Sequence, residues 1–485
     1  MLPDDLREAI KDDMTASAGA LFVEIVARYF ERTGKEAGAV SPTAGHAERR
    51  AAFDEAMPAT GRALDEIVAR LDKEFLGGAN RLSHPMYMGH QVAAPLPAAV
   101  WTEAVIAALN NSLAVQEMSP TGSAVEEQVI RWMCDLAGFG IGAGGTLTSG
   151  GLEATHTALL AARAAFDPDA WTKGVRGAPP VIICGEHAHY AVSRAAGELG
   201  LGTNAVRQVP STNWKMDVGA LNATFSAVKS EGRRIMAVVA TAGHTATGAM
   251  DDLDTIGALC GEHNVWMHVD GAHGASALFS RTHAARLKGI ARARTIAWDP
   301  HKMMLLPLAA GALIARDERD LSSAFSQKAP YLFHSTGDAR SADQGTRSFM
   351  CSRRADALKV WVALQRYGAE GIGALYDHLC SLATTLHALI SQRSDFAALH
   401  VPESNILCFR WIPASVHDEP TLDWLNQQLR ERYNASGRGW ITSTVLGGHR
   451  VLRVTMMNPR TREAHVEELL NGLAAEGAAL VSEKA

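Results

Sequence analysis

Lys302 is the first residue whose position suggests chemistry. It ends the segment Trp298-Asp299-Pro300-His301-Lys302, after a short hydrophobic stretch and before a long apolar run, 303–315. A buried lysine costs free energy unless its charge is neutralised or used. One use is a Schiff base with an aldehyde cofactor. An isolated lysine of this kind is more often an ordinary loop residue, so the other motifs must decide between the two interpretations.

A glycine-rich turn is the second motif. Thr148, Ser149, Gly150 and Gly151 lead directly into a helical pattern. Small residues let the backbone approach an anion, and the start of a helix offers unpaired N–H groups. The turn therefore predicts a phosphate site, although a plain turn before a helix would have the same composition.

A histidine follows one of the predicted strands. His189 lies in His187-Ala188-His189-Tyr190, just after the strand predicted at 181–184. In an open parallel sheet, ligands bind beyond the carboxyl ends of the strands. The imidazole of His189 could stack there on a flat ring. The alternatives are an ordinary loop histidine and a metal pair formed with His187, for which the sequence shows no evident set of partner ligands.

An aspartate ends another predicted strand, 265–269. Asp270 would point into the same crevice, where its carboxylate could raise the pKa of a ring nitrogen and keep it protonated. Gly271 and Ala272 would leave room for a flat ring. The alternative is an aspartate that caps the next turn.

Taken together, the phosphate turn, the stacking histidine, the carboxylate and the lysine describe a site for pyridoxal phosphate. A dinucleotide-binding fold would need a G-x-G-x-x-G motif in the first strand–helix turn. No such motif occurs in a suitable position.

The elements that must position these residues alternate along the chain from about residue 95. Apolar strands separated by helices indicate a parallel sheet that is covered on both faces. Strands are predicted at 181–184, 205–209, 236–241, 265–269, 295–298, 304–306 and 311–315. Helices are predicted at 96–109, 123–137, 153–165, 218–228 and 253–262.

The two ends of the chain have different patterns. Residues 1–95 predict helices with loops, including a helical stripe over 17–33. A long helix over 354–367 and 371–392 leads to a small α+β region, with strands at 405–411, 439–444 and 451–456 and helices at 422–433 and 462–475. We therefore predict an N-terminal helical segment (1–95), a large cofactor-binding domain (96–370) and a small C-terminal domain (371–485).

Composition narrows the class of protein. Of the 485 residues, 47% are hydrophobic and 20% are charged, with a formal net charge of −6. This balance argues against nucleic acid or an anionic membrane as the main partner. The six cysteines form no CxxC pair, so free thiols in a reducing compartment are expected. The N-terminus lacks a signal-peptide pattern and the longest apolar run is too short to span a bilayer, so a cytoplasmic protein is expected.

The motifs and their order resemble those of the group II pyridoxal-phosphate-dependent amino acid decarboxylases, which have the aspartate aminotransferase-like fold (PLP fold type I). The resemblance extends from about Ser83 to Asn458. It rests on the segments 148–154, 241–251, 268–272, 299–302, 331–333, 351–354, 357–361 and 452–459, together with His189.

This resemblance implies a role for each matching residue. The catalytic residues would be Lys302, which binds the cofactor aldehyde; Asp270, on the ring nitrogen; His189, on one ring face; and Tyr331, a proton donor. The cofactor would also contact Ser149, Gly150, Gly151, Thr245, Ala272, Asp299 and His301. Departures from the family pattern are Asp299 for a common asparagine, Gly271 for alanine, Ser352 for glycine, and His244.

The family implies decarboxylation of an L-amino acid to the amine and carbon dioxide. The loop at 84–90 and the segments 331–333 and 351–354 favour a small acidic or diamino substrate, with Tyr87, His90 and Arg453 as substrate-binding candidates. An aromatic substrate is the first alternative, and another pyridoxal lyase or an aminotransferase on the same fold is the second. Members of the family are homodimers with the active site at the interface, and packing on a second copy would bury the N-terminal helices.

Overall fold

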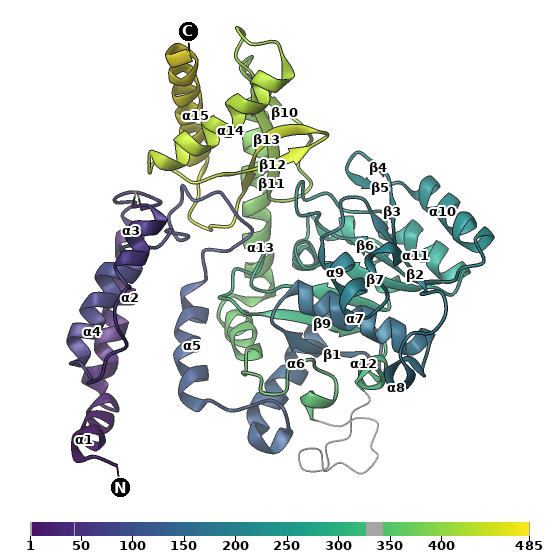
Figure 1. The fold of residues 1–485 in the computed structure, drawn as a ribbon, viewed down its shortest axis with the longest axis horizontal. Coiled ribbons are helices and arrows are strands. Elements are labelled where there is room, and N and C mark those ends of the chain that lie inside the picture. Colours follow the sequence, from purple (N-terminus) through teal and green to yellow (C-terminus); the bar gives the residue numbers. More distant parts are fainter. Residues whose placement is uncertain (1, 43, 326–342, 485) are drawn as a thin grey trace.

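The computed structural model describes residues 2–42, 44–325 and 343–484. Two sheets organise these residues around a long helix, α13 (Figure 1). The helices are α1 (Asp4–Asp13), α2 (Ala16–Gly34), α3 (His46–Ala51), α4 (Leu64–Arg70), α5 (Pro97–Leu109), α6 (Pro120–Leu136), α7 (Gly151–Phe166), α8 (Ala170–Lys173), α9 (Ala191–Glu198), α10 (Val218–Ser230), α11 (Leu253–Glu262), α12 (Arg319–Ala324), α13 (Ala357–Ser391), α14 (Glu419–Ala435) and α15 (Glu463–Lys484).

The larger sheet is mostly parallel, as predicted. Its strands, in spatial order, are β1 (Gly144–Thr148), β9 (Gly311–Ala315), β8 (Thr295–Trp298), β7 (Trp266–Asp270), β6 (Ile235–Thr241), β2 (Val181–Gly185) and β3 (Val206–Val209). Only β9 runs antiparallel to its neighbours in this sheet. The carboxyl ends of β1, β2, β6, β7 and β8 therefore meet at one edge.

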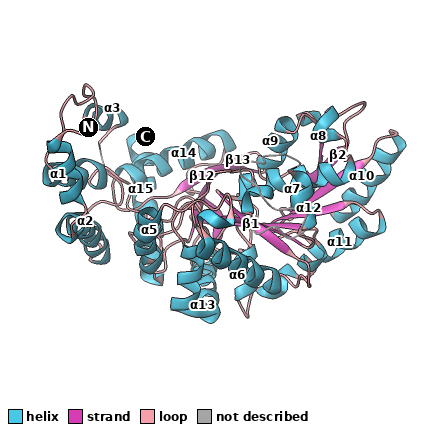
Figure 2. Ribbon diagram, turned by 90° about the horizontal axis from the view of Figure 1, so that it is seen from below, coloured by secondary structure: helices cyan, strands magenta, loops and turns pink. Residues whose placement is uncertain are grey.

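Both faces of this sheet are buried, which explains the unbroken apolar runs of its strands. Within β6, Ala237 and Val239 pack with α7, whereas Val238 and Ala240 face the larger core that includes α6, α11 and α13. Figure 2 shows helices on both sides of the strands.

The smaller sheet is antiparallel. Its order is β10 (Phe396–Ala398), β11 (Ile406–Trp411), β13 (His449–Thr455) and β12 (Thr442–Leu446). A two-stranded ribbon, β4 (Ser211–Thr212) and β5 (Lys215–Met216), follows β3. The break in α13 lies at Gly368, whose φ of 70° is left-handed, two residues before the predicted domain boundary at 370.

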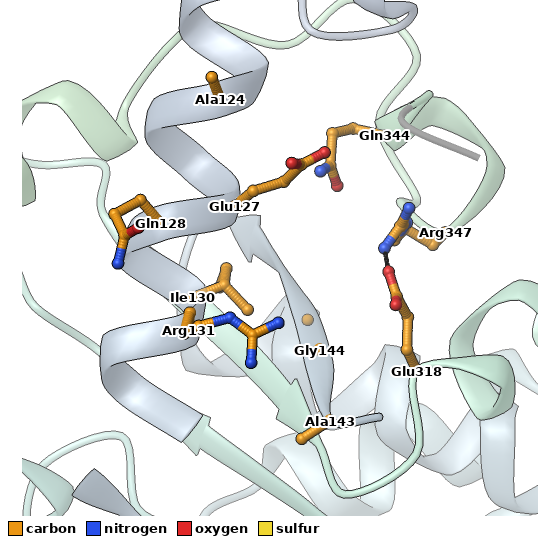
Figure 3. A pocket seen from close by; sticks show the side chains of 11 residues that line it. Ala124, Glu127, Gln128, Ile130, Arg131, Ala143, Gly144, Glu318, Gln344 and Arg347 are labelled. Carbon is orange, nitrogen blue, oxygen red and sulfur yellow. Dashed lines mark ion pairs between the residues drawn. The ribbon is translucent and has the colours of Figure 1, made fainter. Parts of the chain in front are cut away.

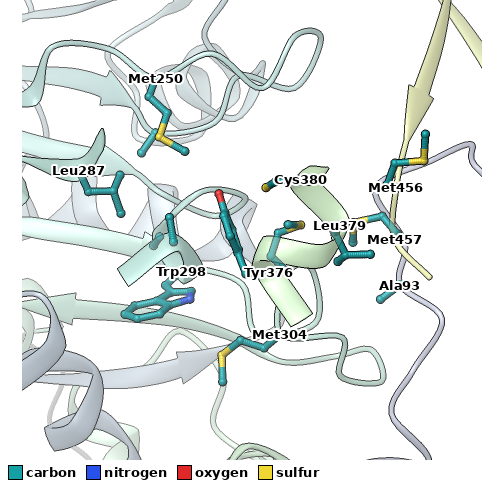
Figure 4. Close-up of a cluster of buried hydrophobic side chains, with 14 of the residues drawn as sticks. Ala93, Met250, Leu287, Trp298, Met304, Tyr376, Leu379, Cys380, Met456 and Met457 are labelled. Atoms are coloured by element: carbon teal, nitrogen blue, oxygen red, sulfur yellow. The ribbon is translucent and has the colours of Figure 1, made fainter. Parts of the chain in front are cut away.

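A continuous apolar core joins the end of β8 to α13 and the small sheet. Trp298 is fully buried and lies near Tyr376 and Met304, and the cluster continues through Leu379 to Met457 (Figure 4). The residue that precedes Asp299 is thus fixed by close packing, which limits the freedom of the catalytic segment after it.

Two strand predictions were wrong. Residues 304–306 form a buried turn instead of a strand, and Leu305 has a φ of 57°. The strand β1 was missed because Gly144 and Gly145 disfavour a strand on propensity. Its glycines are required by packing, since a Cβ on Gly145 would lie 2.4 Å from the carbonyl oxygen of Leu313.

The cysteines are free thiols, and all but Cys351 are buried. Within the described ranges, no helix combines the length and apolarity that crossing a bilayer would need.

Candidate active site

The carboxyl edge of the large sheet brings the predicted motifs together. Asp270 is the last residue of β7, Asp299 follows β8, and the glycine turn follows β1. His189 lies in the loop after β2, immediately before α9. Because these strands are parallel, their side chains converge as the sequence predicts.

The glycine turn lies against the Asp270–Ala272 segment and the Asp299–Lys302 segment. A Cβ on Gly151 would lie 2.7 Å from the Cβ of Ala272 and 3.1 Å from Oδ2 of Asp299, and a Cβ on Gly150 would lie 3.2 Å from the His301 ring. Side chains at these two positions would fill the space at the start of α7. The glycines therefore keep open a cradle whose free N–H groups suit a phosphate.

Ser149 is placed differently from its two neighbours. Its backbone N–H and its hydroxyl both donate to Oε2 of Glu153, at 2.8 and 2.6 Å, and the residue is exposed. The strand before this turn is anchored by Glu126, which accepts from the N–H of Leu147 and pairs with Arg353 at 2.7 and 2.8 Å. This buried ion pair fixes the direction from which the turn enters the site.

His301 presents a defined tautomer. Its Nδ1 accepts a hydrogen bond from the N–H of Ala310 at 3.0 Å, so the ring proton resides on Nε2. Burial lowers the pKa of His301, although the charge of Asp299 opposes this. A neutral imidazole with an Nε2–H donor beside Gly150 can hold a phosphate oxygen.

Lys302 forms an ion pair with Asp299. Its Nζ lies 3.0 Å from Oδ2 of Asp299, whose side chain is only 2% exposed, whereas that of Lys302 is 22% exposed. The other carboxylate oxygen of Asp299, Oδ1, is buried without a hydrogen-bond partner. Oδ2 also lies 3.5 Å from Nε2 of His301. The unusual aspartate is therefore held between a lysine and a histidine.

Asp270 and His189 belong to the same electrostatic cluster. Asp270 is buried, and its Oδ1 accepts from the N–H of Ala272 at 3.3 Å. Burial lowers the pKa of His189, while the charge of Asp270 opposes and that of Lys302 reinforces the shift. Nδ1 of His189 accepts from the N–H of Ala191 at 3.2 Å, which orients the ring.

The expected reason for Gly271 needs correction. A Cβ at this position would lie 2.9 Å from the carbonyl oxygen of Ala297 and 3.0 Å from the Cβ of Ala275. The glycine is thus required by the packing of β7 against β8 and the following turn. It does not make room for a ligand ring.

The residues at this edge fit pyridoxal phosphate. The glycine cradle and the Nε2–H of His301 suit its phosphate, Asp270 suits its ring nitrogen, and Lys302 suits its aldehyde. Ala272 is small enough to pack under one face of the cofactor ring, and the flat imidazole of His189 suits the other face.

Arg453 lies beside the loop that contains Thr245. Its Nη2 donates to the carbonyl oxygen of Thr245 at 2.5 Å, and its Nε donates to that of Ala246 at 3.0 Å. Thr245 itself is exposed. The predicted substrate-binding arginine therefore clamps the Thr245 loop from the small sheet.

The loop that contains Tyr87 and His90 packs beside the small sheet, where Tyr87 forms a backbone bridge with Trp440. The ring of Tyr87 stacks on Trp440, with centroids 6.3 Å apart and planes 3° apart. His90 is exposed at the surface, but partial desolvation lowers the pKa of its imidazole, and the charges of Arg453 and Arg430 lower it further. Trp440 and Arg430 were not predicted as site residues, because their distance in sequence from Tyr87 and His90 hides the contact.

A buried pair that the sequence did not reveal lies behind the Thr245 loop. Nε2 of His244 is 3.0 Å from Oδ1 of Asp251, which also accepts from the N–H of Met216, and Oδ2 accepts from the N–H of Thr241. Burial opposes protonation of His244, but Asp251 outweighs it and raises the pKa of the imidazole. This pair explains how a histidine is accommodated at position 244, where it departs from the family pattern.

Tyr331, the predicted proton donor, lies outside the described residues.

A separate cavity of about 470 Å³ lies between α6, β1 and the segment around Arg347 (Figure 3). Arg347 forms an ion pair across it with Glu318. None of the described residues that line it is a predicted catalytic residue, so it is distinct from the site at the sheet edge.

Comparison with known proteins agrees with this geometry. The model of a family described as "Pyridoxal-dependent decarboxylase conserved domain" matches residues 46–412. The chain is 34% identical over 427 residues to L-2,4-diaminobutyrate decarboxylase of Rhizobium meliloti (strain 1021), covering 86% of this chain and 83% of the relative. It is 30% identical to the cysteine sulfinic acid decarboxylase of Rattus norvegicus, covering 88% of each.

Solved structures give the same result. The crystal structure of mouse CSAD in apo form superposes with a TM-score of 0.89 at 27% identity, covering 96% of this chain and 99% of the other. The glutamate decarboxylase domain of a Vibrio parahaemolyticus diaminobutyrate-pyruvate transaminase and L-2,4-diaminobutyrate decarboxylase gives a TM-score of 0.85, also at 27% identity, covering 96% of each chain.

Proposed function

Because the chain belongs to the pyridoxal-dependent decarboxylase family, we propose that it removes the carboxyl group of a small acidic L-amino acid. Its general activity is that of a pyridoxal-phosphate-dependent carboxy-lyase acting on amino acids. The geometry that supports the individual roles is the convergence of Lys302, Asp270 and the glycine turn at one sheet edge.

Each residue at this edge has one task in the proposal. Gly150, Gly151 and His301 hold the cofactor phosphate, and Lys302 supplies the amine that attaches the aldehyde. Asp270 holds a proton at the ring nitrogen, where its charge is unscreened because the carboxylate is buried. When bound, pyridoxal phosphate supplies the electron sink for cleavage of the bond between Cα and the carboxyl group.

The proton that replaces carbon dioxide at Cα needs a donor. We assign this step to Tyr331 on the sequence motif alone. The amine of Lys302 would hold the cofactor aldehyde in the resting enzyme.

The small-sheet side supports an acidic substrate. The groups that act electrostatically on His90 are two arginines, Arg453 and Arg430, so an anionic side chain would be attracted there and an ammonium group repelled. The Tyr87–Trp440 stack forms an apolar wall beside them. A diamino acid is the second candidate, because a relative that matches over 86% of this chain is an L-2,4-diaminobutyrate decarboxylase.

Carbon dioxide release from a panel of amino acids, with added pyridoxal phosphate, tests this substrate class. Aspartate, glutamate and cysteine sulfinate should exceed 2,4-diaminobutyrate, and aromatic amino acids should be turned over least. Arg430→Met should lower kcat/KM for the best acidic substrate by about 10-fold, as expected for loss of one favourable charge near the substrate. Arg233→Met, far from the site, is the control. A preference for diaminobutyrate would reject the acidic assignment while leaving the decarboxylase activity intact.

We also propose a homodimer with the active site at the subunit interface. Phe22 and Val23 on α2 and Trp101, Val105 and Leu109 on α5 are exposed apolar side chains, and α1–α4 stand beside the body of the molecule (Figure 1). A second copy would remove this apolar surface from water.

Light scattering should give twice the chain mass of 51.8 kDa. Val105→Asp should shift the protein toward monomer and lower activity with it, because a charge would be placed in the apolar contact. Val445→Asp, at an exposed valine of the small sheet, is the control. A fully active monomer would refute the dimer proposal.

A further inference from the structure

Lys359 is a second buried lysine, and it lies outside the site described above. It occupies the first turn of α13 and has no exposed side-chain surface. Its Nζ donates to the carbonyl oxygens of Ala309 at 2.6 Å and Pro307 at 3.3 Å. It also lies 2.8 Å from Oε1 of Glu103 and 3.0 Å from Oδ1 of Asp356. Two carboxylates and two carbonyls therefore surround a buried ammonium group, which has three protons to donate.

The carbonyl that Lys359 contacts most closely is connected directly to His301. The oxygen of Ala309 and the N–H of Ala310 belong to the same planar peptide group. That N–H donates to Nδ1 of His301 at 3.0 Å, and the N–H of His301 donates back to the oxygen of Ala310 at 3.1 Å. A cation on the peptide oxygen polarises the group and makes its N–H a stronger donor.

The donor strength of Ala310 matters because it decides which ring nitrogen of His301 carries the proton. With Nδ1 fixed as an acceptor, Nε2 must be the donor, and it lies beside Gly150 at the start of α7. Without the cation, the carbonyl oxygen of Ala309 would lose its charged hydrogen bond to α13. The hydrogen bond that sets the orientation and the tautomer of the ring would then be weaker.

We propose that Lys359 is a positioning residue for the cofactor phosphate, acting through the Ala309–Ala310 peptide to hold His301 with its Nε2–H toward the Gly150–Gly151 turn. This inference rests on the proposed assignment of the phosphate to that turn and His301. It gives α13 a part in cofactor recognition, although no residue of α13 touches the cradle in this scheme.

Binding of pyridoxal phosphate and of pyridoxal, which lacks the phosphate, separates a phosphate-specific role from a general one. The cofactor-free protein is titrated with each compound and followed by absorbance. Lys359→Met should weaken pyridoxal phosphate binding by about 10- to 100-fold, the range for loss of a hydrogen bond to a charged group. Pyridoxal binding should change by less than about threefold. Lys215→Met removes a partly exposed lysine that pairs with Glu403 and should leave both affinities unchanged.

His301→Gln distinguishes failure of the inference from failure of the phosphate assignment. If His301→Gln weakens only pyridoxal phosphate binding and Lys359→Met does not, Lys359 has no such role. If neither variant discriminates between the two compounds, the phosphate assignment itself is wrong, and the inference falls with it. If Lys359→Met weakens the binding of both compounds equally, the role of Lys359 is merely structural.

Removal of Lys359 alone takes one cation from the partly buried carboxylates of Glu103 and Asp356 and leaves them with Arg354, which is destabilising. The triple variant Lys359→Met, Glu103→Gln, Asp356→Asn removes these three charges together and should be more stable than the single variant. The triple variant must show the same selective loss of pyridoxal phosphate affinity. An unchanged ratio of the affinities for pyridoxal phosphate and pyridoxal would overturn the inference.

Discussion

Replacing Lys302 by alanine should abolish carbon dioxide release and remove the visible absorption band of lysine-bound pyridoxal phosphate. The loss in kcat should be on the order of 10³-fold or more, as expected when a covalent nucleophile is removed. Lys302 is the lysine that the end of β8 presents beside the glycine cradle, with Asp299 as its partner. Absorbance spectra and a carbon dioxide assay with excess cofactor measure the two effects independently.

A loss of folding must be separated from a loss of chemistry in this experiment. Without Lys302, the buried carboxylate of Asp299 would lose its ion-pair partner, and its Oδ1 has no hydrogen bond already. An unpaired buried charge is destabilising. The double variant Lys302→Ala, Asp299→Asn avoids this cost and should be as inactive as the single variant. Lys288→Ala, at an exposed lysine, is the control. Substantial turnover by the double variant would show that another group attaches the cofactor.

The sequence predicted the large sheet well because both faces of its strands are buried. Continuous apolar runs mark β2, β6, β7 and β8 to within one or two residues, whereas the glycines of β1 conceal a strand that only its packing against β9 explains. The turn at 304–306 has the same apolar composition as a strand. This turn packs between the large sheet and α13, and composition does not encode those contacts.

The convergence of the candidate catalytic residues could be predicted for a related reason. Residues at the ends of neighbouring parallel strands are brought to one edge by topology alone, so Asp270 and Lys302 could be placed together from their order. Arg453 could not be placed in this way, because two of its hydrogen bonds are to backbone carbonyls more than 200 positions earlier in the chain. The identity of a side chain does not show which backbone carbonyls an arginine guanidinium will donate hydrogen bonds to.

Lys359 is a second residue whose role could not be predicted from the sequence. Like Lys302, it stands in an apolar pattern, here between Leu358 and Val360 on α13. The pattern alone could have indicated a buried lysine. Its acceptors, Glu103 and the carbonyl of Ala309, come from two other parts of the chain, so its connection to His301 emerges only from the fold.

Replacing Asp270 by asparagine should lower kcat by about 10²- to 10³-fold, the range for removal of one preorganised electrostatic group in an active site. Asparagine keeps the size of the side chain and can still accept from the N–H of Ala272, but it has no charge with which to hold a proton at the ring nitrogen. Binding of pyridoxal phosphate should weaken much less, because the cradle and Lys302 are retained. Steady-state carbon dioxide release and cofactor titration check the two parts of this prediction.

A change in the ionisation of His189 would not account for the loss of kcat in the Asp270→Asn variant. Burial lowers its pKa, and the charge of Asp270 is an influence that opposes the shift. Removing that charge lowers the pKa of His189 further, so the imidazole stays neutral and keeps its stacking face in the variant. The loss can therefore be assigned to the ring nitrogen. Asp254→Asn, at an aspartate paired with Arg292 and Lys288 away from the site, is the matched control. A variant Asp270→Asn with near-normal kcat would mean that the carboxylate does not act on the ring nitrogen, and that the proton there is held by another group.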